Sequence, residues 1–281
     1  MQQVMRIVAI LVAALAVAGG SSQAATSSTR ELDESFWSRA LNAQLHFAVF
    51  LPEGYEGSQQ RYPVIYALHG LPAGSGSYRN TVFVADAVSR IHGDAIVVSP
   101  QAARDHDSDP EYHDWGDGRD WATALTRELT AVVDARFRTI RSRAGRALVG
   151  FSAGGYGASV IGLHHLDEFA VVESWSGYFH PTDPSGRHSL DVGSTEANKY
   201  ANVHELVPKL RRLFRLHPTY FAFYVGDKDF FAPENVRLNR ELERAGVWHT
   251  FRVYSGGHQL ALWESEAPRW LDLALGHLVQ S

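Results

Sequence analysis

One serine in the middle of the chain stands in a setting that could make it a nucleophile. Residues 147–157 read as a short apolar strand, a sharp turn carrying Ser152, and a helix start made of small residues. Gly150 and Gly154 flank the serine in the pattern G-x-S-x-G, and glycine leaves room for a closely crossing chain. The pattern predicts covalent catalysis by Ser152. The alternative is a Gly/Ser turn without chemistry, so partner residues must decide.

A serine hydroxyl is a weak nucleophile and needs a histidine base. His258 follows the last expected strand in the segment Ser255-Gly256-Gly257-His258, where two glycines allow a flexible turn. The rival histidines after Ser152 are His164, His165, His180, His188, His204, His217, His249 and His277. Of these, His164, His165 and His277 fall on expected helices, and His249 stands at the wrong end of a strand. We therefore assign the base to His258.

The histidine in turn needs an acid that orients it. Asp227 and Asp229 both follow the expected strand at 219–225, and sites in parallel α/β sheets lie at the carboxyl ends of strands. Asp229 is the preferred acid, and Asp227 is the alternative. The other aspartate of the pair is expected to bind backbone in the turn.

Two backbone N–H groups are needed to stabilise the oxyanion that forms during attack on an ester. Ala153 follows the nucleophile at the start of a helix, so its N–H is one candidate. The glycine-rich turn after the strand at 63–68 contains His69-Gly70-Leu71, and the N–H of Leu71 is the second candidate.

Apolar runs separated by glycine-rich and polar turns predict the elements that position these residues. Strands are expected at 36–41, 45–51, 63–68, 95–100, before Ser152, and at 170–175, 219–225 and 250–254. Helices are expected at 81–91, 121–137, 153–165, 203–216, 233–245 and 263–278. Residues 26–34 are polar and are expected to be loose.

The alternation of strands and helices after an opening hairpin predicts an α/β fold with a mostly parallel eight-stranded sheet and helices on both faces. Five strands lead up to the serine and three follow its helix, which is the chain order of an α/β-hydrolase fold. The long connection at 176–218 is a candidate for a small cap over the site.

Composition and the first residues bear on where the protein acts. The chain has 281 residues, no cysteine and a net charge of −5, and no run of like charges suggests nucleic acid or an anionic membrane as partner. Residues 1–25 combine an apolar run with small residues suited to signal peptidase. They predict secretion to the extracellular space, cell wall or periplasm, with a catalytic domain at 26–281. An uncleaved anchor is the alternative, and the oligomeric state is open.

Three aromatic residues in the long connections on the carboxyl side of the sheet are candidates for substrate binding: Trp115, Tyr178 and Phe179. Trp121 belongs to the same group, and Asp114, Asp117 and Asp120 lie near the two tryptophans and could accept hydrogen bonds. Aromatic faces with carboxylates suit a sugar or phenolic ester. The alternative is that these aromatic side chains pack in the core, where large aromatic residues are mostly found.

No metal site or cofactor is expected. Residues 105–109 resemble a calcium loop, but Pro110 stands where the loop needs glycine and Gly116 where it needs glutamate. No H-E-x-x-H motif is present.

With these residues in place, the chain from about Phe36 onward resembles the esterase D family of α/β-hydrolases. That family includes secreted feruloyl and acetylxylan esterases, S-formylglutathione hydrolases and mycobacterial mycolyltransferases. The segments that carry the resemblance are 49–55, 68–70, 150–155, 226–229 and 256–258. The resemblance implies Ser152 as nucleophile, Asp229 as acid, His258 as base, and Leu71 and Ala153 as oxyanion donors.

Residues 125–129 and 175–181 are similar to the mycolyltransferase branch. His69 and Pro72 depart from that branch, which has aspartate and arginine at these positions, and this puts trehalose binding in doubt. We therefore expect a secreted serine esterase acting on small-molecule or polysaccharide-linked esters of sugars or phenolic acids. The alternatives are a mycolyltransferase-like acyltransferase that uses a sugar hydroxyl, and a non-catalytic binding protein.

Overall fold

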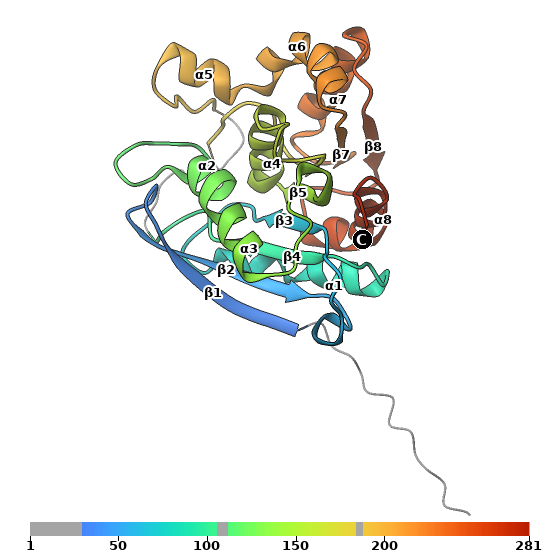
Figure 1. The fold of residues 1–281 in the computed structure, drawn as a ribbon. Coiled ribbons are helices and arrows are strands. Elements are labelled where there is room, and N and C mark those ends of the chain that lie inside the picture. Colours follow the sequence, from blue (N-terminus) through green and yellow to red (C-terminus); the bar gives the residue numbers. More distant parts are fainter. Residues whose placement is uncertain (1–29, 106–111, 184–187, 281) are drawn as a thin grey trace, which may run out of the picture.

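The sheet at the centre of the molecule runs in the order β1-β2-β4-β3-β5-β6-β7-β8 (Figure 1). It is seen in a computed structural model that describes residues 30–105, 112–183 and 188–280. The strands are β1 (Arg30–Ser38), β2 (Ala43–Leu51), β3 (Val64–Leu68), β4 (Ile96–Pro100), β5 (Arg146–Phe151), β6 (Val171–Trp175), β7 (Tyr220–Gly226) and β8 (Thr250–Tyr254). Strands β3 to β8 are parallel and β1 and β2 antiparallel, which confirms the predicted α/β-hydrolase fold.

The opening hairpin differs from the prediction in its bounds. Strand β1 begins at Arg30, which pairs with Leu51, so residues 30–34 are not loose as expected. The backbone ladder with β2 orders this polar segment although several of its side chains remain exposed. Leu41 belongs to the turn rather than to the strand, and Asn42 has the positive φ of 47° that a tight turn requires.

Two helical layers cover the sheet (Figure 1). The helices are η1 (Tyr55–Gly57), η2 (Ser77–Thr81), α1 (Val82–Arg90), α2 (Trp121–Thr123), η3 (Ala124–Leu129), α3 (Thr130–Arg136), η4 (Arg143–Gly145), α4 (Ala153–His164), α5 (Thr195–Ala201), α6 (Val203–Leu216), α7 (Ala232–Arg244) and α8 (Leu260–Gly276). Helices α1 and α8 pack on one face, and α3, α4, α6 and α7 pack on the other. All five residues of β3, β4 and β6 are buried, because parallel strands are covered on both faces.

The helical segment at 121–136 links the opening hairpin to the rest of the fold. It is continuous, with a π-helical turn at η3. Glu128 lies in that turn and accepts hydrogen bonds from the Ser38 hydroxyl and from the backbone N–H groups of Arg39 and Ala40. One carboxylate therefore fixes the β1–β2 turn against the helical layer.

The connection at 176–218, which was a candidate for a cap, contains helices α5 and α6. Helix α6 leads from the carboxyl side of the sheet back to the start of β7 and buries Val207 and Leu210 against the sheet. It is thus the crossover helix that any pair of parallel strands requires. Helix α5 was not expected, and it packs beside α4, where Tyr200 stacks on His164.

The expected signal peptide at 1–25 and most of the acidic stretch at 105–109 lie outside the described residues. Within the described parts of the chain, no helix has the length and apolar character needed to cross a membrane.

Candidate active site

Ser152 lies in a strained turn between β5 and α4. Its backbone has φ 54° and ψ −125°, which few non-glycine residues adopt. The glycines around it are required by space, because a β carbon at Gly154 would stand 2.1 Å from the carbonyl oxygen of Leu68. At Gly150 it would stand 2.1 Å from the carbonyl oxygen of Gly154. The sharp turn is therefore possible only with glycine at both positions.

His258 lies between Ser152 and Asp229. Its Nε2 atom is 2.9 Å from Ser152 Oγ, and its Nδ1 atom is 2.9 Å from Asp229 Oδ2. An ionised carboxylate only accepts hydrogen bonds, so Nδ1–H donates to Asp229 and Nε2 accepts from the serine hydroxyl. The Asp229 side chain is fully buried, whereas that of His258 is 17% exposed. The structure thus brings together the three residues that the sequence selected for catalysis.

Asp227 and Asp229 take different partners in the loop after β7. Asp229 also accepts a hydrogen bond from the backbone N–H of Phe231 at 2.9 Å, so both of its oxygens are engaged. Asp227 accepts from the N–H of Gly256 at 2.9 Å. The structure places Asp229 beside His258, while Asp227 fixes the loop that carries the histidine.

The turn after β3 lies directly against Ser152. A β carbon at Gly70 would stand 3.0 Å from the Ser152 β carbon, so the chain of this turn passes close to the site. Tyr112 donates a hydrogen bond from its hydroxyl to the carbonyl oxygen of His69 at 2.5 Å and holds the turn in place. Burial lowers the pKa of His69 to about 4, so its ring is neutral at ordinary pH. Leu71 follows in the same turn, and Ala153 is the first residue of α4.

A buried carboxyl group lies beneath the elbow. The backbone N–H of Ser152 donates to the carbonyl oxygen of Trp175 at 2.9 Å. The indole N–H of Trp175 donates to Glu173 Oε2 at 3.0 Å. Burial raises the pKa of Glu173 well above its ordinary value, so folding favours the protonated form of this side chain.

Two of the expected substrate-binding residues are core residues instead. Phe179 has no exposed surface and packs edge-on against Phe223, and Tyr178 is 2% exposed and stacks on Tyr156. The sequence-based prediction for this pair is corrected. Their rings carry a large apolar surface beside the sheet. Burying this surface lowers the free energy more than any contact it could make while exposed to water.

Trp115 is half-buried and packs edge-on against His113, which is hydrogen-bonded to Tyr156 of α4. The nearby aspartates are used within the loop: both oxygens of Asp114 accept hydrogen bonds from Thr123, and Asp120 accepts one from the N–H of Gly116. Asp117 is exposed, so the expected set of aromatic faces and carboxylates is reduced to Trp115 and Asp117.

Phe230 lies beside the histidine and was not selected from the sequence. Its ring centroid is 4.6 Å from that of His258, and the residue is 55% exposed. Trp263 packs edge-on against the same imidazole at 5.1 Å but is buried. The sequence could have indicated Phe230, because this residue directly follows Asp229, and a neighbour of the predicted acid is expected to lie near the predicted base.

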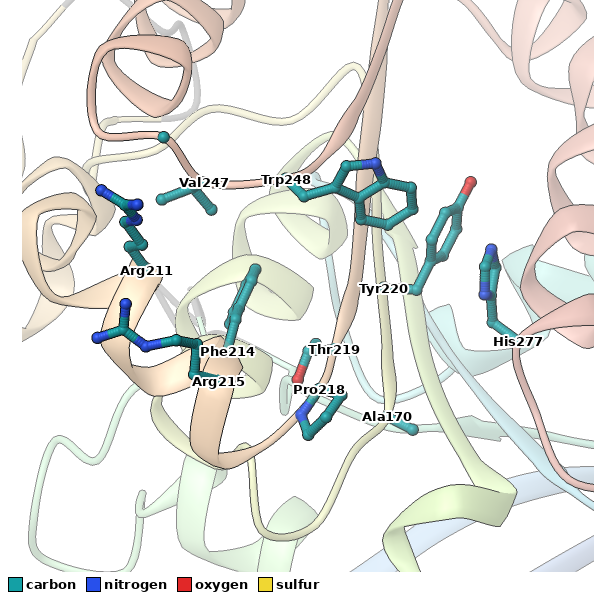
Figure 2. A pocket seen from close by; sticks show the side chains of 11 residues that line it. Ala170, Arg211, Phe214, Arg215, Pro218, Thr219, Tyr220, Val247, Trp248 and His277 are labelled. Atoms are coloured by element: carbon teal, nitrogen blue, oxygen red, sulfur yellow. The ribbon is translucent and has the colours of Figure 1, made fainter.

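A cavity of about 580 Å³ lies at the amino ends of strands β6, β7 and β8 (Figure 2). Ala170, Thr219 and Trp248 line it, and they stand just before β6, β7 and β8. Ser152, Asp229 and His258 follow the carboxyl ends of β5, β7 and β8, so this cavity is on the side away from them. Arg211 and Arg215 of α6 complete one wall of it.

Comparison with known proteins identifies a family and a fold. The family model described as "Putative esterase" matches residues 38–270. Esterase Rv1288 of Mycobacterium tuberculosis is 30% identical over 129 residues, which are 46% of this chain and 28% of that protein. The match thus spans little more than a quarter of that relative.

Solved structures extend the likeness to the whole fold. A ferulic acid esterase superposes with a TM-score of 0.77 at 26% identity, covering 89% of this chain and 99% of its own. Mycobacterium tuberculosis MPT51 superposes with a TM-score of 0.69 at 17% identity, covering 90% and 100%, and this likeness concerns the fold alone.

The fold and the comparisons place the protein in the α/β-hydrolase class. Within that class, the chain belongs to the esterase family.

Proposed function

We propose that the protein is a secreted serine esterase that hydrolyses carboxylic esters through an acyl-enzyme on Ser152. The observation that carries the proposal is the position of His258, with Ser152 Oγ at 2.9 Å on one side and Asp229 Oδ2 at 2.9 Å on the other. This geometry supplies a nucleophile, a base and an acid that fixes the tautomer of the base.

In the first half of the reaction, Ser152 Oγ attacks the ester carbonyl while its proton passes to His258 Nε2. The resulting imidazolium is stabilised by the buried carboxylate of Asp229. The histidine then gives the proton to the leaving alcohol, and an acyl group remains on the serine. Water, deprotonated by the same histidine, releases the acid and restores the hydroxyl.

The tetrahedral intermediates carry a negative oxygen that needs donors. We assign these to the N–H groups of Ala153 and Leu71. Ala153 opens α4, where the helix dipole favours negative charge, and Leu71 follows Gly70, which lies against Ser152. An alanine at Gly70 would crowd this space.

The substrate is proposed to be an ester of a sugar or a phenolic acid. Phe230 offers an exposed aromatic face next to His258, on which a flat or apolar acyl group can pack. The ferulic acid esterase among the structural neighbours supports a phenolic acyl group. Trp115 remains a candidate for the more distant part of the substrate.

The test is a screen of purified protein on p-nitrophenyl esters of rising chain length and on methyl ferulate, each with and without trehalose. Hydrolysis that depends on Ser152 supports the esterase, and a preference for ferulate supports the phenolic acyl group. Acylated trehalose among the products, with little free acid, would instead favour the acyltransferase alternative. Absence of turnover and of covalent labelling by a fluorophosphonate would contradict both.

Secretion is a separate part of the proposal and rests on residues 1–25. Expression of the full chain in a bacterial host, followed by N-terminal sequencing of the exported protein, should find cleavage after Ala24 or Ala25. Retention of the intact leader in the membrane fraction would support the anchor instead.

A further inference from the structure

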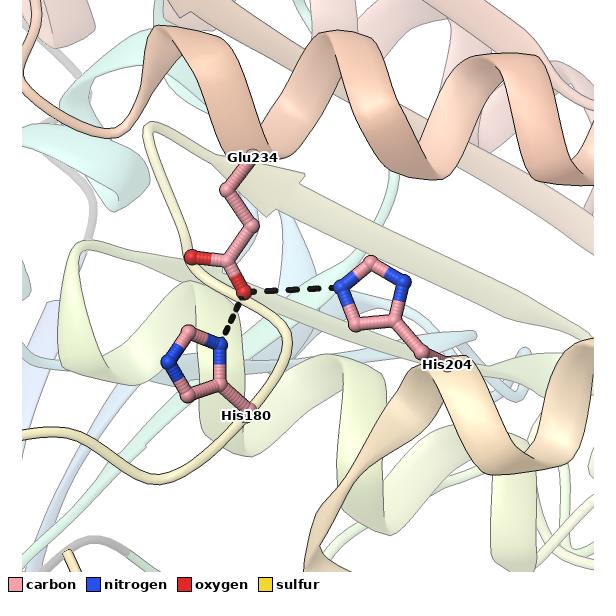
Figure 3. Close-up of side chains that lie close together, drawn as sticks. All are labelled: His180, His204 and Glu234. Carbon is pink, nitrogen blue, oxygen red and sulfur yellow. Dashed lines mark hydrogen bonds and ion pairs between the residues drawn. The ribbon is translucent and has the colours of Figure 1, made fainter. Parts of the chain in front are cut away.

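Three ligand-type side chains from three separate elements meet beside the core (Figure 3). His180 lies in the loop after β6, His204 near the start of α6, and Glu234 in the first turn of α7. One ligand atom from each lies within 4.8 Å of the other two. Glu234 Oε1 is 2.5 Å from His180 Nδ1 and 3.6 Å from His204 Nε2.

His204 is oriented toward this cluster by a second carboxylate. Its Nδ1 atom is 2.5 Å from Glu241 Oε2, so the proton on Nδ1 is donated to Glu241. The opposite atom, Nε2, is buried and has no hydrogen-bond partner, and the side chain is only 7% exposed. A carboxylate that holds the far nitrogen of an imidazole is the usual support of a metal-binding histidine.

With a proton on Nε2, His204 forms only a long ion pair with Glu234, whose Oε1 atom also accepts a hydrogen bond from the backbone N–H of Phe179 at 2.8 Å. Such a proton would face Glu234 Oε1 at 3.6 Å, beyond the range of a hydrogen bond. Without the proton, a lone pair would face a carboxylate oxygen in a buried setting, which is repulsive. A cation between the two groups satisfies both, because it accepts the lone pair and neutralises the carboxylate.

We propose that His180, His204 and Glu234 bind one Zn²⁺ ion. Two imidazole nitrogens and one carboxylate oxygen suit zinc, whereas Ca²⁺ and Mg²⁺ prefer oxygen ligands. Tetrahedral ligand atoms around zinc stand about 3.3 Å apart, since each bond is about 2.0 to 2.1 Å. The 3.6 Å separation is close to this value, and the 2.5 Å contact must open by about 0.8 Å as the metal replaces a proton.

The fourth position would be taken by water. A cavity of about 320 Å³ borders the cluster and is lined by His180, His204, Asn202 and Arg237 among others. This space is larger than one water molecule needs. The metal would join the loop after β6 to α6 and α7, and α7 begins three residues after Asp229. Its role is thus to stabilise the packing of these three elements. The proposal does not depend on ester hydrolysis.

The experiment uses the purified full-length protein after treatment with EDTA. Zn²⁺ is titrated by calorimetry, the bound metal is counted by mass spectrometry, and the melting temperature is followed. One ion per chain is expected, and free Zn²⁺ at about 100 times its Kd should raise Tm by about 5 to 10 °C. Co²⁺ in place of Zn²⁺ should give the visible absorption of a tetrahedral site with nitrogen and oxygen ligands.

His180→Ala is the main variant, because this side chain is 37% exposed and its loss should leave the fold intact. It should weaken Zn²⁺ binding at least tenfold and reduce the Tm response. His188→Ala is the matched control, since His188 forms a comparable pair with Asp183 outside the cluster. Equal binding by His180→Ala and wild type, or no stoichiometric binding by wild type, would overturn the proposal and leave a charged His204 between two glutamates.

Discussion

Asp229 and His258 are 29 residues apart in the chain, and their side chains meet at 2.9 Å. They meet because β7 and β8 are neighbouring parallel strands, so the loops that follow them leave the sheet at the same edge. Asp227 strengthens this approach by accepting a hydrogen bond from Gly256 N–H in the second loop. The two aspartates of one short segment thus separate into one that faces the base and one that fixes the base's loop.

Replacing the nucleophile should stop catalysis without unfolding the protein. Ser152→Ala is expected to lower kcat on p-nitrophenyl acetate by about 10⁴-fold or more, and His258→Ala by a similar factor, because each disables the same unit. Ser265→Ala on α8 is the control and should keep full activity. Circular dichroism and Tm check the fold, and near-normal hydrolysis by Ser152→Ala would exclude the acyl-enzyme mechanism.

The two aspartates should differ strongly in their effect on rate. Asp229→Asn is expected to lower kcat by about 10⁴-fold, because a neutral amide no longer fixes the tautomer of His258 or stabilises its imidazolium. Asp227→Asn should cost less than about tenfold, since the amide oxygen can still accept the Gly256 hydrogen bond. Steady-state kinetics of both variants decide the matter, and a larger loss in Asp227→Asn would reverse the assignment.

Phe230 should act on substrate selection rather than on stability. Phe230→Ala is expected to lower kcat/KM for an aromatic ester about tenfold and for an acetyl ester much less, with Tm nearly unchanged, because the ring is already 55% exposed. Trp248→Ala, an exposed aromatic at the opposite edge of the sheet, is the control. A uniform loss on both esters with a lowered Tm would indicate a packing role.

The elbow glycines should tolerate no side chain. Gly154→Ala is expected to destabilise the protein by about 1 to 3 kcal/mol and to abolish activity, because its β carbon would collide with the Leu68 carbonyl oxygen. Gly276→Ala provides the control, since nothing stands within 4 Å of a β carbon there. Urea unfolding measures both, and equal stability of the two variants would mean that the turn can open without cost.

Glu173 should make stability depend on pH. Its pKa is raised in the folded state, so folding favours the protonated form, and this contribution is present at low pH and declines as pH rises above the unfolded pKa. Wild type should therefore lose more unfolding free energy between pH 5 and 8 than Glu173→Gln, as measured by urea unfolding at the two values. Glu53→Gln, an exposed carboxyl, should behave as wild type. Parallel losses in all three proteins would place the pH dependence elsewhere.

Most of the fold was predictable because local pattern and architecture agree. Continuous apolar runs such as β3 and β7 are typical of strands buried on both faces, and the glycines around Ser152 are required because a β carbon there would collide with backbone atoms. The start of β1 was missed because residues 30–34 are charged except for Leu32, and the ladder with β2 orders them. Helix α5 was missed because it has seven residues and buries only Ala201.

The candidate catalytic residues could be predicted from their order in the chain, but the aromatic residues that line the site could not. The chain order of nucleophile, acid and base limited the search to loops after particular strands, so Ser152, Asp229 and His258 could be selected before their distances were known. The exposure of aromatic side chains near the site could not be predicted from chain order. Tyr178 and Phe230 are both aromatic residues in loops on the carboxyl side, and only packing distinguishes the buried one from the exposed one.

The cluster of His180, His204 and Glu234 gave no pattern in the sequence for a similar reason. His180 and Glu234 are 54 residues apart and come from a loop and a helix that meet only after the sheet has formed. Metal-site motifs with short spacing depend on a single helix or turn, and this cluster depends on three elements.

The loop that carries His258 follows β8, and in the described part of the chain β8 lies at the end of the sheet with β7 as its one neighbour. Val253 in this strand is 48% exposed. An edge strand opens more readily than the central strands, so His258, the proposed base, follows one of the two strands that should fray before the middle of the sheet. The nucleophile is attached to β5, near the middle. The protein can then lose its base while its nucleophile and most of its core stay in place, so that the working life of the catalyst and the lifetime of the fold are separate quantities.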